Sequence, residues 1–288
     1  MDKAICQLKK LPENGLNFEA FFYIINLLRN ERGGGMRIFA ASPGALQRGL
    51  DFLTDRGRVV SLVGGGGKST VMYFLAQTCA KQGKRVLVTT TTNIFQPADC
   101  VYARNAEEIQ ALWDQGSIAV IGTPIPGKGK FQSPDPELLR WAKERADIVL
   151  IEADGSKHCP IKVPRDGEPV ILPECDTVLA VMGLSAIGQP LKNVAFRLPD
   201  VIRLLGAEED HILTEEDAAR ILSSSFGSRK GVGDRHFCVI LNQCDDGPRR
   251  RSANLIAQYL ERYDVENVVM TAFDPDERKK FNALAGVR

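Results

Sequence analysis

A run of four glycines followed by Lys, Ser and Thr, at residues 64–70, constrains the fold of this chain more than any other feature. It follows an apolar, β-branched segment at 58–63, which predicts a buried strand, and it leads into an amphipathic segment at 68–82, which predicts a helix. Glycines place no Cβ atoms in the way, so backbone N–H groups can converge on an anion. The N-terminus of the helix adds a positive dipole end, and the segment therefore predicts a phosphate-binding loop.

The residues of this loop have separate expected roles. Lys68 would reach the β- and γ-phosphates of a nucleotide, and the hydroxyl of Ser69 would bind Mg²⁺. The nucleotide-binding residues predicted here are Gly64, Gly65, Gly66, Gly67, Lys68, Ser69 and Thr70. The full GxxxxGKS/T pattern is not met, because Leu62 stands where its first glycine would be. The segment instead resembles the shorter GGxGKS/T loop of the P-loop NTPases of the partition, nitrogenase iron-protein and metallochaperone class.

Beyond residue 58 the sequence alternates apolar strands with amphipathic helices. Strands are predicted at 84–92, 117–121, 147–152, 176–182, 236–241 and 266–271, and helices at 105–114, 135–145, 199–205, 214–223 and 249–262. This alternation predicts an α/β fold of the P-loop NTPase type, with a mostly parallel sheet and helices on both faces. Ligands of such sheets bind at the carboxyl ends of the strands, so the loops after 58–63, 147–152 and 236–241 are the candidate site.

We expect one NTPase domain over residues 36–288, with a helical insertion at 184–234. Residues 1–35 admit two interpretations. Met36 follows a Gly-rich stretch that a ribosome-binding-like sequence can encode, so residues 1–35 could be a non-native or flexible extension. They could equally contain a native amphipathic helix at 17–29.

Composition narrows the class of protein. Lys and Arg number 37 against 36 Asp and Glu, so the chain lacks the overall positive charge that nucleic-acid binding favours. The longest apolar run, at 18–28, is too short to span a bilayer. The seven cysteines include no CxxC pair, which is typical of reduced thiols in a cytosol. We therefore expect a cytoplasmic protein that binds neither nucleic acid nor a membrane.

The predicted strand at 147–152 ends in acidic residues, in the sequence Glu-Ala-Asp-Gly at 152–155. P-loop enzymes place a carboxylate at this strand end, because Mg²⁺ is a hard cation that prefers oxygen ligands. Glu152 is the expected metal ligand together with Ser69. Asp154 could instead hold the metal or orient the attacking water, and Lys157 could contact phosphate or face solvent.

The predicted strand at 236–241 ends in Asn-Gln-Cys-Asp, which matches the NKxD pattern of guanine-specific NTPases except at Gln243. The carboxylate of Asp245 would accept two N–H groups from the guanine edge, a donor pair that adenine lacks. Asn242 would brace the loop and contact the base, and the N–H of Ala272 would meet the guanine oxygen. The pattern favours GTP over ATP.

Three other segments have open interpretations. The threonines at 89–92 could bind phosphate or simply favour a strand, and the Gly/Pro-rich segment at 122–136, with Lys128 and Lys130, could be a mobile lid or a surface connection. His158 and Cys159 suggest a metal or selenium site, although their spacing to Cys175 is poor for zinc and idle thiols are commoner.

Several segments together resemble one known family, the accessory proteins of selenium-dependent hydroxylases, also called YqeC-like. The matching segments are VVSLVGGGGKST at 59–70, VLVTTTTNIF at 86–95, EADGSK at 152–157, EPVI at 168–171, GLSAIGQPL at 183–191 and LNQCD at 241–245. The resemblance implies a bacterial nucleotide-binding protein that takes part in maturing selenium-containing molybdenum hydroxylases. The family often has Lys at the position of Gln243 and Arg-Leu at 158–159, so base choice and the role of Cys159 depart from its pattern.

The interpretation we favour is a Mg²⁺-dependent NTPase, GTP-using rather than ATP-using, with Lys68, Glu152 and Asp154 as its catalytic residues. Hydrolysis of the nucleotide would drive the loading of a labile selenium or sulfur ligand onto a molybdenum cofactor or onto the apo-enzyme. The protein client would be a molybdenum hydroxylase or a maturation factor. The alternatives are a nucleotide-gated chaperone with negligible turnover and a kinase-like phosphotransferase. The oligomeric state is open.

Overall fold

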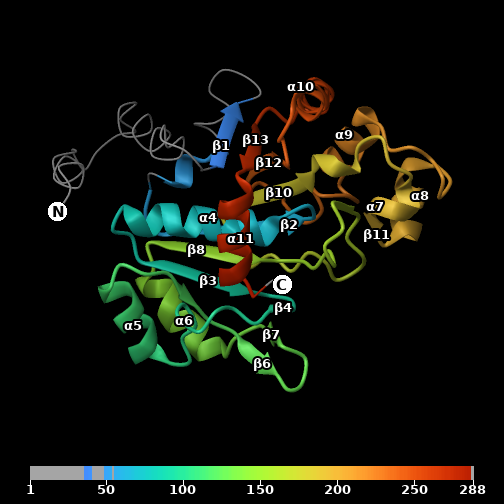
Figure 1. The fold of residues 1–288 in the computed structure, drawn as a ribbon. Helices are drawn as coiled ribbons and strands as arrows, with labels where there is room; N and C mark the ends of the chain where they lie inside the picture. Colours follow the sequence, from blue (N-terminus) through green and yellow to red (C-terminus); the bar gives the residue numbers. More distant parts are fainter. Residues whose placement is uncertain (1–35, 41–48, 54, 287–288) are drawn as a thin grey trace.

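The computed structural model describes residues 36–40, 49–53 and 55–286, so both interpretations of residues 1–35 lie outside it (Figure 1). Its main sheet has eight strands in the order β1-β13-β12-β10-β2-β8-β3-β5. These strands are β1 (Met36–Ala40), β2 (Arg58–Gly64), β3 (Val86–Thr90), β5 (Ala119–Val120), β8 (Ile148–Glu152), β10 (Thr177–Gly183), β12 (His236–Asn242) and β13 (Val268–Phe273). All neighbours pair in parallel except β1, which is antiparallel to β13 at the edge. The predicted α/β fold with a mostly parallel sheet is confirmed.

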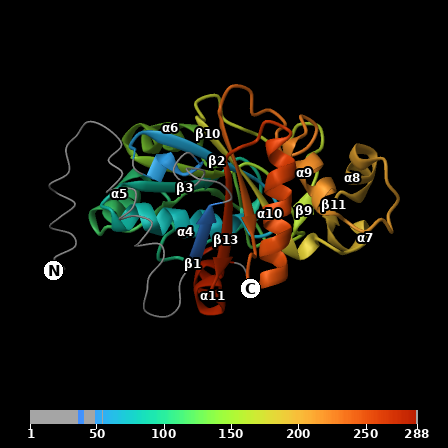
Figure 2. The ribbon, with the colours of Figure 1, turned by 90° about the horizontal axis from the view of Figure 1, so that it is seen from above.

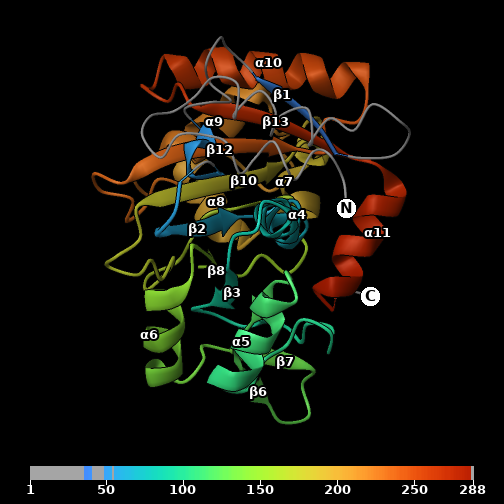
Figure 3. The ribbon, with the colours of Figure 1, turned by 90° about the vertical axis from the view of Figure 1, so that its left-hand side faces the viewer.

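Helices cover both faces of this sheet. They are α4 (Lys68–Lys81), α5 (Ala106–Asp114), α6 (Pro136–Arg145), α7 (Leu191–Val194), α8 (Leu198–Leu205), α9 (Glu215–Ser223), α10 (Gly247–Glu261) and α11 (Pro275–Leu284). On one face, α4 and α11 share a hydrophobic cluster with Leu179 and Val181 of β10. On the other, α8, α9 and α10 pack on the intervening Ala180, and α5 and α6 pack on β3, β8 and β5 (Figure 3). Successive side chains of a strand point to opposite faces, which explains the division.

The insertion predicted at 184–234 contains the short 3-10 helix η2 (Leu184–Ala186), α7, β11 (Ala195–Phe196), α8 and α9. Strand β11 pairs in parallel with β9 (Ile161–Lys162), so this region is tied to the loop that follows β8. Figure 2 shows α7, α8 and β11 together at one end of the molecule, beside α9. The helices share one hydrophobic cluster with the main sheet and therefore pack as part of the same body.

The Gly/Pro-rich segment at 122–136 forms a hairpin. Its strands β6 (Thr123–Ile125) and β7 (Lys130–Gln132) pair with each other, and β7 also pairs with β4 (Ile94–Phe95). Phe131 is fully buried, which anchors the hairpin to the domain. Of the helices that the structure describes, none is both long enough and apolar enough to cross a membrane.

Asp147 joins the starts of three central strands, at the edge of the sheet opposite the phosphate loop. It accepts a hydrogen bond of 2.8 Å from the backbone N–H of Arg85, and the guanidinium of Arg56 lies 3.3 Å away. Burial alone would raise the pKa of Asp147, but the hydrogen bonds from the backbone and side chain of Arg85 outweigh it and hold the pKa below its ordinary value.

We therefore expect Asp147→Asn to lower the free energy of unfolding by about 1–2 kcal/mol at pH 7. An acid with a lowered folded-state pKa stabilises the fold above its unfolded pKa of about 3.9, and this contribution is lost as the pH falls through the folded value. Urea unfolding between pH 7 and pH 3.5 measures this contribution: the difference in the free energy of unfolding between variant and wild type should narrow as the pH falls. The exposed control Asp276→Asn should show no such gap, and a gap at Asp147 that does not change with pH would contradict the assignment.

Candidate functional site

The carboxyl ends of β2, β8 and β12 meet at one edge of the sheet, and the glycine loop lies there between β2 and α4. A cavity of about 420 Å³ opens beside it. Residues of the loop, of the segment after β8, of the β4–β7 sheet and of α11 line this cavity; among them are Lys68, Ser69, Glu152, Lys130, His158 and Arg278. The sequence-predicted phosphate loop and acidic strand end are thus neighbours in space.

Close packing explains why the loop consists of glycines. Gly66 has a φ of +71°, and a Cβ atom on it would lie 2.0 Å from the backbone nitrogen of Gly183. Gly67 has a φ of +108°, and its Cβ would lie 2.5 Å from the side-chain nitrogen of Asn242. Two features therefore exclude larger residues at these positions: the left-handed backbone conformation, and the close approach of residues at the ends of neighbouring strands.

The first three glycines do not leave their N–H groups open for an anion. These groups donate to protein oxygens: from Gly64 to both carboxylate oxygens of Asp154 (3.1 Å each), from Gly65 to the carbonyl of Val181 (2.8 Å), and from Gly66 to the carbonyl of Cys159 (3.1 Å). The sequence predicted all four glycines as phosphate donors. In this arrangement the open N–H groups are those of the first turn of α4, which have no intrahelical partners.

Lys68 belongs to a buried network of charges. Its ammonium donates to the carbonyl of Gly64 at 2.6 Å and lies 3.2 Å from Asp154. The other oxygen of Asp154 lies 3.0 Å from Lys162, which also contacts Glu168 at 3.1 Å. Glu168 in turn pairs with Arg197 at the start of α8, at 2.7 Å. The network runs from the phosphate loop into the helical insertion.

Ser69 and Glu152 face each other across the mouth of the loop. The hydroxyl of Ser69 donates to Oε2 of Glu152 at 3.0 Å. Burial raises the pKa of Glu152, against the opposing effects of the Lys68 ammonium and of this hydrogen bond. Two hard oxygen donors side by side fit Mg²⁺, which is held in such sites by one or two protein oxygens, substrate phosphates and water. Within the described part of the chain no three His, Cys, Asp or Glu side chains converge on a possible metal position, so phosphate and water would have to complete the coordination.

The loop after β12 is fastened to the phosphate loop. The amide of Asn242 donates to the carbonyl of Gly66 at 2.8 Å, and its oxygen accepts from the hydroxyl of Thr271 at 2.9 Å. Asp245 lies 3.1 Å from Arg249 and 3.2 Å from Arg278, which lines the cavity. Asp245 is therefore close to the cavity without lining it.

Ala272 was expected in a loop beyond the last strand, and Gln243 stands where the NKxD pattern has lysine. Ala272 is a buried residue inside β13, which extends to Phe273, rather than part of a loop beyond the strand. The side chain of Gln243 accepts from the N–H of Ser185 at 3.2 Å, so it points to the end of β10. The base-reading role of the Ala272 N–H remains a prediction.

The threonines after β3 and the pair His158–Cys159 have local partners. Thr90 donates to the carbonyl of Glu152 at 2.9 Å, and Thr91 donates to the carbonyl of Val170 at 2.7 Å. The imidazole of His158 stacks on Phe95, with ring centroids 5.3 Å apart. The threonine hydroxyls thus hold the strand end, and His158 forms part of the cavity wall.

Several residues that line the cavity were not predicted from the sequence. Helix α11 brings Arg278 and Asn282 to it, and Asn282 accepts a hydrogen bond of 3.0 Å from Thr70. The sequence does contain a helix-start signal here: Asp274 is a favourable N-cap residue, and Pro275 follows at the first helical position. Phe95 carried no comparable signal, because its place depends on the pairing of β4 with β7.

Backbone strain gathers around the cavity. Lys157, His158 and Gln243 all line it and all have positive φ, at 46°, 65° and 66°. Such conformations cost energy in residues other than glycine and concentrate at functional sites. The strained backbone supports a ligand-binding role for this cavity.

The chain was compared with known proteins. The profile of the family described as YqeC protein matches residues 60–199. YqeC of Escherichia coli (strain K12) is 31% identical over an alignment of 232 positions, which covers 74% of this chain and 86% of that protein. HypB from Helicobacter pylori, solved in complex with nickel, covers 84% of this chain and 91% of its own, with a TM-score of 0.35 and 10% identity, and no property of HypB is transferred at that level. The identity and coverage of the E. coli protein show that the chain belongs to the YqeC family.

Proposed function

We propose that this protein binds a nucleoside triphosphate with Mg²⁺ in the cavity beside the glycine loop and hydrolyses it. The observation that carries the proposal is the pairing of Ser69 with Glu152 at 3.0 Å, next to Lys68 and at the N-terminus of α4. A cation, a pair of hard oxygen donors and a helix N-terminus at one point are what a Mg²⁺–triphosphate requires.

Each residue of the site would have a separate role in binding. Lys68 and the first-turn N–H groups of α4 would neutralise and orient the phosphate chain. Ser69 and Glu152 would hold Mg²⁺, which when bound screens charge on the phosphate oxygens. Asp154 touches Lys68 and would position its ammonium.

We propose guanine as the base. Asn242 ties the loop that carries Asp245 to the phosphate loop, which supports a base-reading role for the Asp245 carboxylate. The guanine edge offers two N–H groups to that carboxylate, and adenine does not.

Asp245→Asn tests the base. Wild type should bind GTP more tightly than ATP or CTP in calorimetric titrations with Mg²⁺. The variant should lose at least about tenfold in GTP affinity, because a donor amide replaces one acceptor oxygen. It should gain affinity for XTP, whose ring has a carbonyl where guanine has an amino group. Affinity for ATP is the internal control, because the proposed contact of Asp245 with guanine has no counterpart on adenine and the substitution should leave ATP binding unchanged.

Thermal unfolding of the variant shows whether losing the contacts to Arg249 and Arg278 disturbs the fold. A wild-type protein without preference for GTP contradicts the base assignment.

A nucleotide-gated switch is a second candidate, favoured by one observation. The N–H groups of Gly64, Gly65 and Gly66 already have protein acceptors, so phosphate could reach them only if the loop rearranged. Single-turnover hydrolysis separates the candidates: micromolar binding without turnover would favour the switch. We propose, on the sequence resemblance described above, that either activity serves a protein client in the maturation of selenium-dependent molybdenum hydroxylases.

A further inference from the structure

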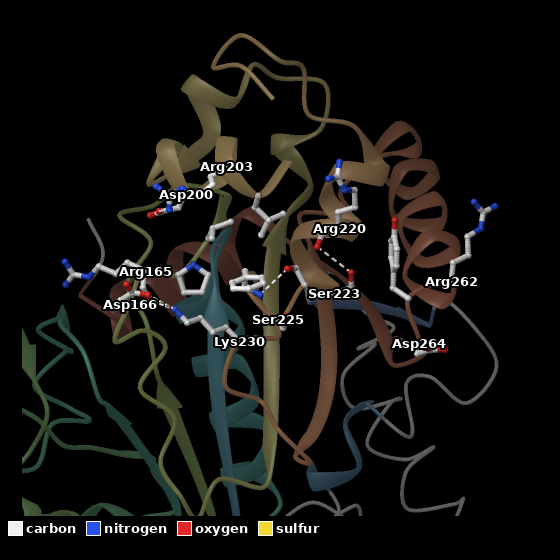
Figure 4. Close-up of a pocket in the computed structure, with 16 residues that line it drawn as sticks. Arg165, Asp166, Asp200, Arg203, Arg220, Ser223, Ser225, Lys230, Arg262 and Asp264 are labelled. Carbon is white, nitrogen blue, oxygen red and sulfur yellow. Dashed lines mark hydrogen bonds and ion pairs between the residues drawn. The ribbon is translucent and has the colours of Figure 1, made fainter. Parts of the chain in front are cut away.

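A second, larger cavity of about 1160 Å³ lies away from the phosphate loop (Figure 4). Its wall comes from three regions: the segment after β9, the helices α8 and α9, and the segment between α9 and β12 together with the end of α10. It shares no lining residue with the cavity beside the glycine loop. Ligand sites commonly occupy about 300–1,000 Å³, so this cavity suits an occupant of dinucleotide size.

Positive charge dominates the charged side chains of this wall. Five cationic and three acidic side chains line it; these are Arg165, Arg203, Arg220, Lys230 and Arg262, with Asp166, Asp200 and Asp264. Figure 4 shows Arg203 and Arg220 on the helices above the cavity and Arg165 and Lys230 on the segments below it. The arginines come from separate elements, and the fold, not the local sequence, brings them to one cavity.

The ion pairs of two of these cations, Arg165 and Arg203, are exposed to solvent and leave both side chains available. The side chain of Arg203 is 78% exposed and bonds to Asp200 at 3.1 Å, and that of Arg165 is 67% exposed and lies 3.5 Å from Glu168. Pairs this exposed contribute little, so an incoming anion can replace them at small cost. Planar guanidinium groups bind phosphate oxygens in pairs, which makes phosphate the anion that the wall fits.

An aromatic side chain stands exposed in the same wall. Phe226 is 76% exposed, far more than the other large apolar residues on the described surface. Tyr263, 37% exposed, lines the cavity as well. Exposed aromatic rings beside arginines are platforms on which heterocycles stack.

The wall of the large cavity directly follows the charge network of the phosphate loop in sequence. Lys162 contacts Asp154, and the next two residues, Val163 and Pro164, line the large cavity. A small hollow is lined both by Gly64, Asp154 and Lys162 of the charge network and by Pro164 of the large cavity. The two sites are thus adjacent but distinct.

We propose that this cavity is a second binding site, for an organic pyrophosphate that carries aromatic heterocycles and has the size of a dinucleotide. Arginines on opposite sides of the cavity hold the pyrophosphate, and Phe226 stacks on a ring. The site is independent of triphosphate binding at Lys68.

Flavin adenine dinucleotide is the probe, because it combines both chemical features and its fluorescence anisotropy reports binding. Riboflavin, which lacks phosphate, and inorganic pyrophosphate, which lacks a ring, should each bind at least about tenfold more weakly. Arg165→Glu/Arg203→Glu should weaken binding of the probe at least about tenfold, and Phe226→Ser about tenfold. Arg104→Glu, an equally exposed charge reversal outside both cavities, should change nothing.

Binding of the probe should survive Lys68→Ala, which separates this site from the nucleotide site. Absence of binding, equal binding of riboflavin or of pyrophosphate alone, or equal binding to the Arg165→Glu/Arg203→Glu variant would each overturn the proposal. Loss of binding in Lys68→Ala would assign the probe to the phosphate loop instead and would equally overturn it.

Discussion

Lys68→Ala is expected to weaken binding of GTP with Mg²⁺ at least about a hundredfold and to abolish single-turnover hydrolysis. Lys68 is 3% exposed at the N-terminus of α4, and the buried Lys162 is not expected to replace it, because Lys162 is held by Asp154 and Glu168. Truncating a buried partner of a charged contact costs about 2–5 kcal/mol, which corresponds to this factor. Calorimetry measures the affinity, and phosphate release in a single turnover measures hydrolysis.

The matched control is Lys130→Ala. Lys130 lines the same cavity from β7, where its ammonium lies 5.2 Å from the centre of the Phe95 ring. Its removal should cost less than about tenfold, because a rim cation is screened by solvent. If both variants bind GTP as wild type does, the phosphate site is elsewhere.

Asp154→Ala is expected to have the largest effect on stability. Asp154 is 1% exposed, lies between Lys68 and Lys162, and accepts the N–H of Gly64. Its removal leaves two buried ammonium groups that share no carboxylate, and breaking a buried pair in this way costs about 3–5 kcal/mol. For a chain of this size the melting temperature should fall on the order of 10 °C.

A second substitution tests the cause. In Asp154→Ala/Lys162→Met one of the two buried ammonium groups is gone and only Lys68 keeps an unpaired charge, so part of the lost stability should return. Asp166→Ala, which removes a fully exposed carboxylate, should change the free energy of unfolding by less than about 0.5 kcal/mol. Equal melting temperatures for Asp154→Ala and Asp166→Ala would show that the network does not stabilise the fold.

The central part of the fold was predictable from local sequence. The apolar segment at 58–63, the glycines and the amphipathic segment at 68–82 correspond to β2, the loop and α4 within one residue. The strand end at Glu152 was predictable for the same reason, since buried parallel strands have continuous apolar sequences. Neighbouring positions of Ser69 and Glu152 then follow from the order of the sheet.

Long-range pairing limited the rest. Strand β1 depends on its antiparallel pairing with β13, and β4 depends on pairing with β7, about 36 residues further along the chain. The short sequences of these strands carry little periodicity of their own. The hydrogen bonds from Gly64 and Gly65 were equally hidden, because their acceptors Asp154 and Val181 lie about 90 and 116 residues further along the chain.

The site takes Lys68, Glu152, Asn242 and Arg278 from four separate segments of the chain, namely the start of α4, the end of β8, the end of β12 and α11. A ligand that touches all four regions binds only when they are assembled, and by mass action it adds about 2.7 kcal/mol to the folded state at a concentration one hundred times its Kd. If that ligand is the proposed triphosphate, its cellular level would influence how long the protein resists proteolysis, and the abundance of the protein would then follow the nucleotide pool.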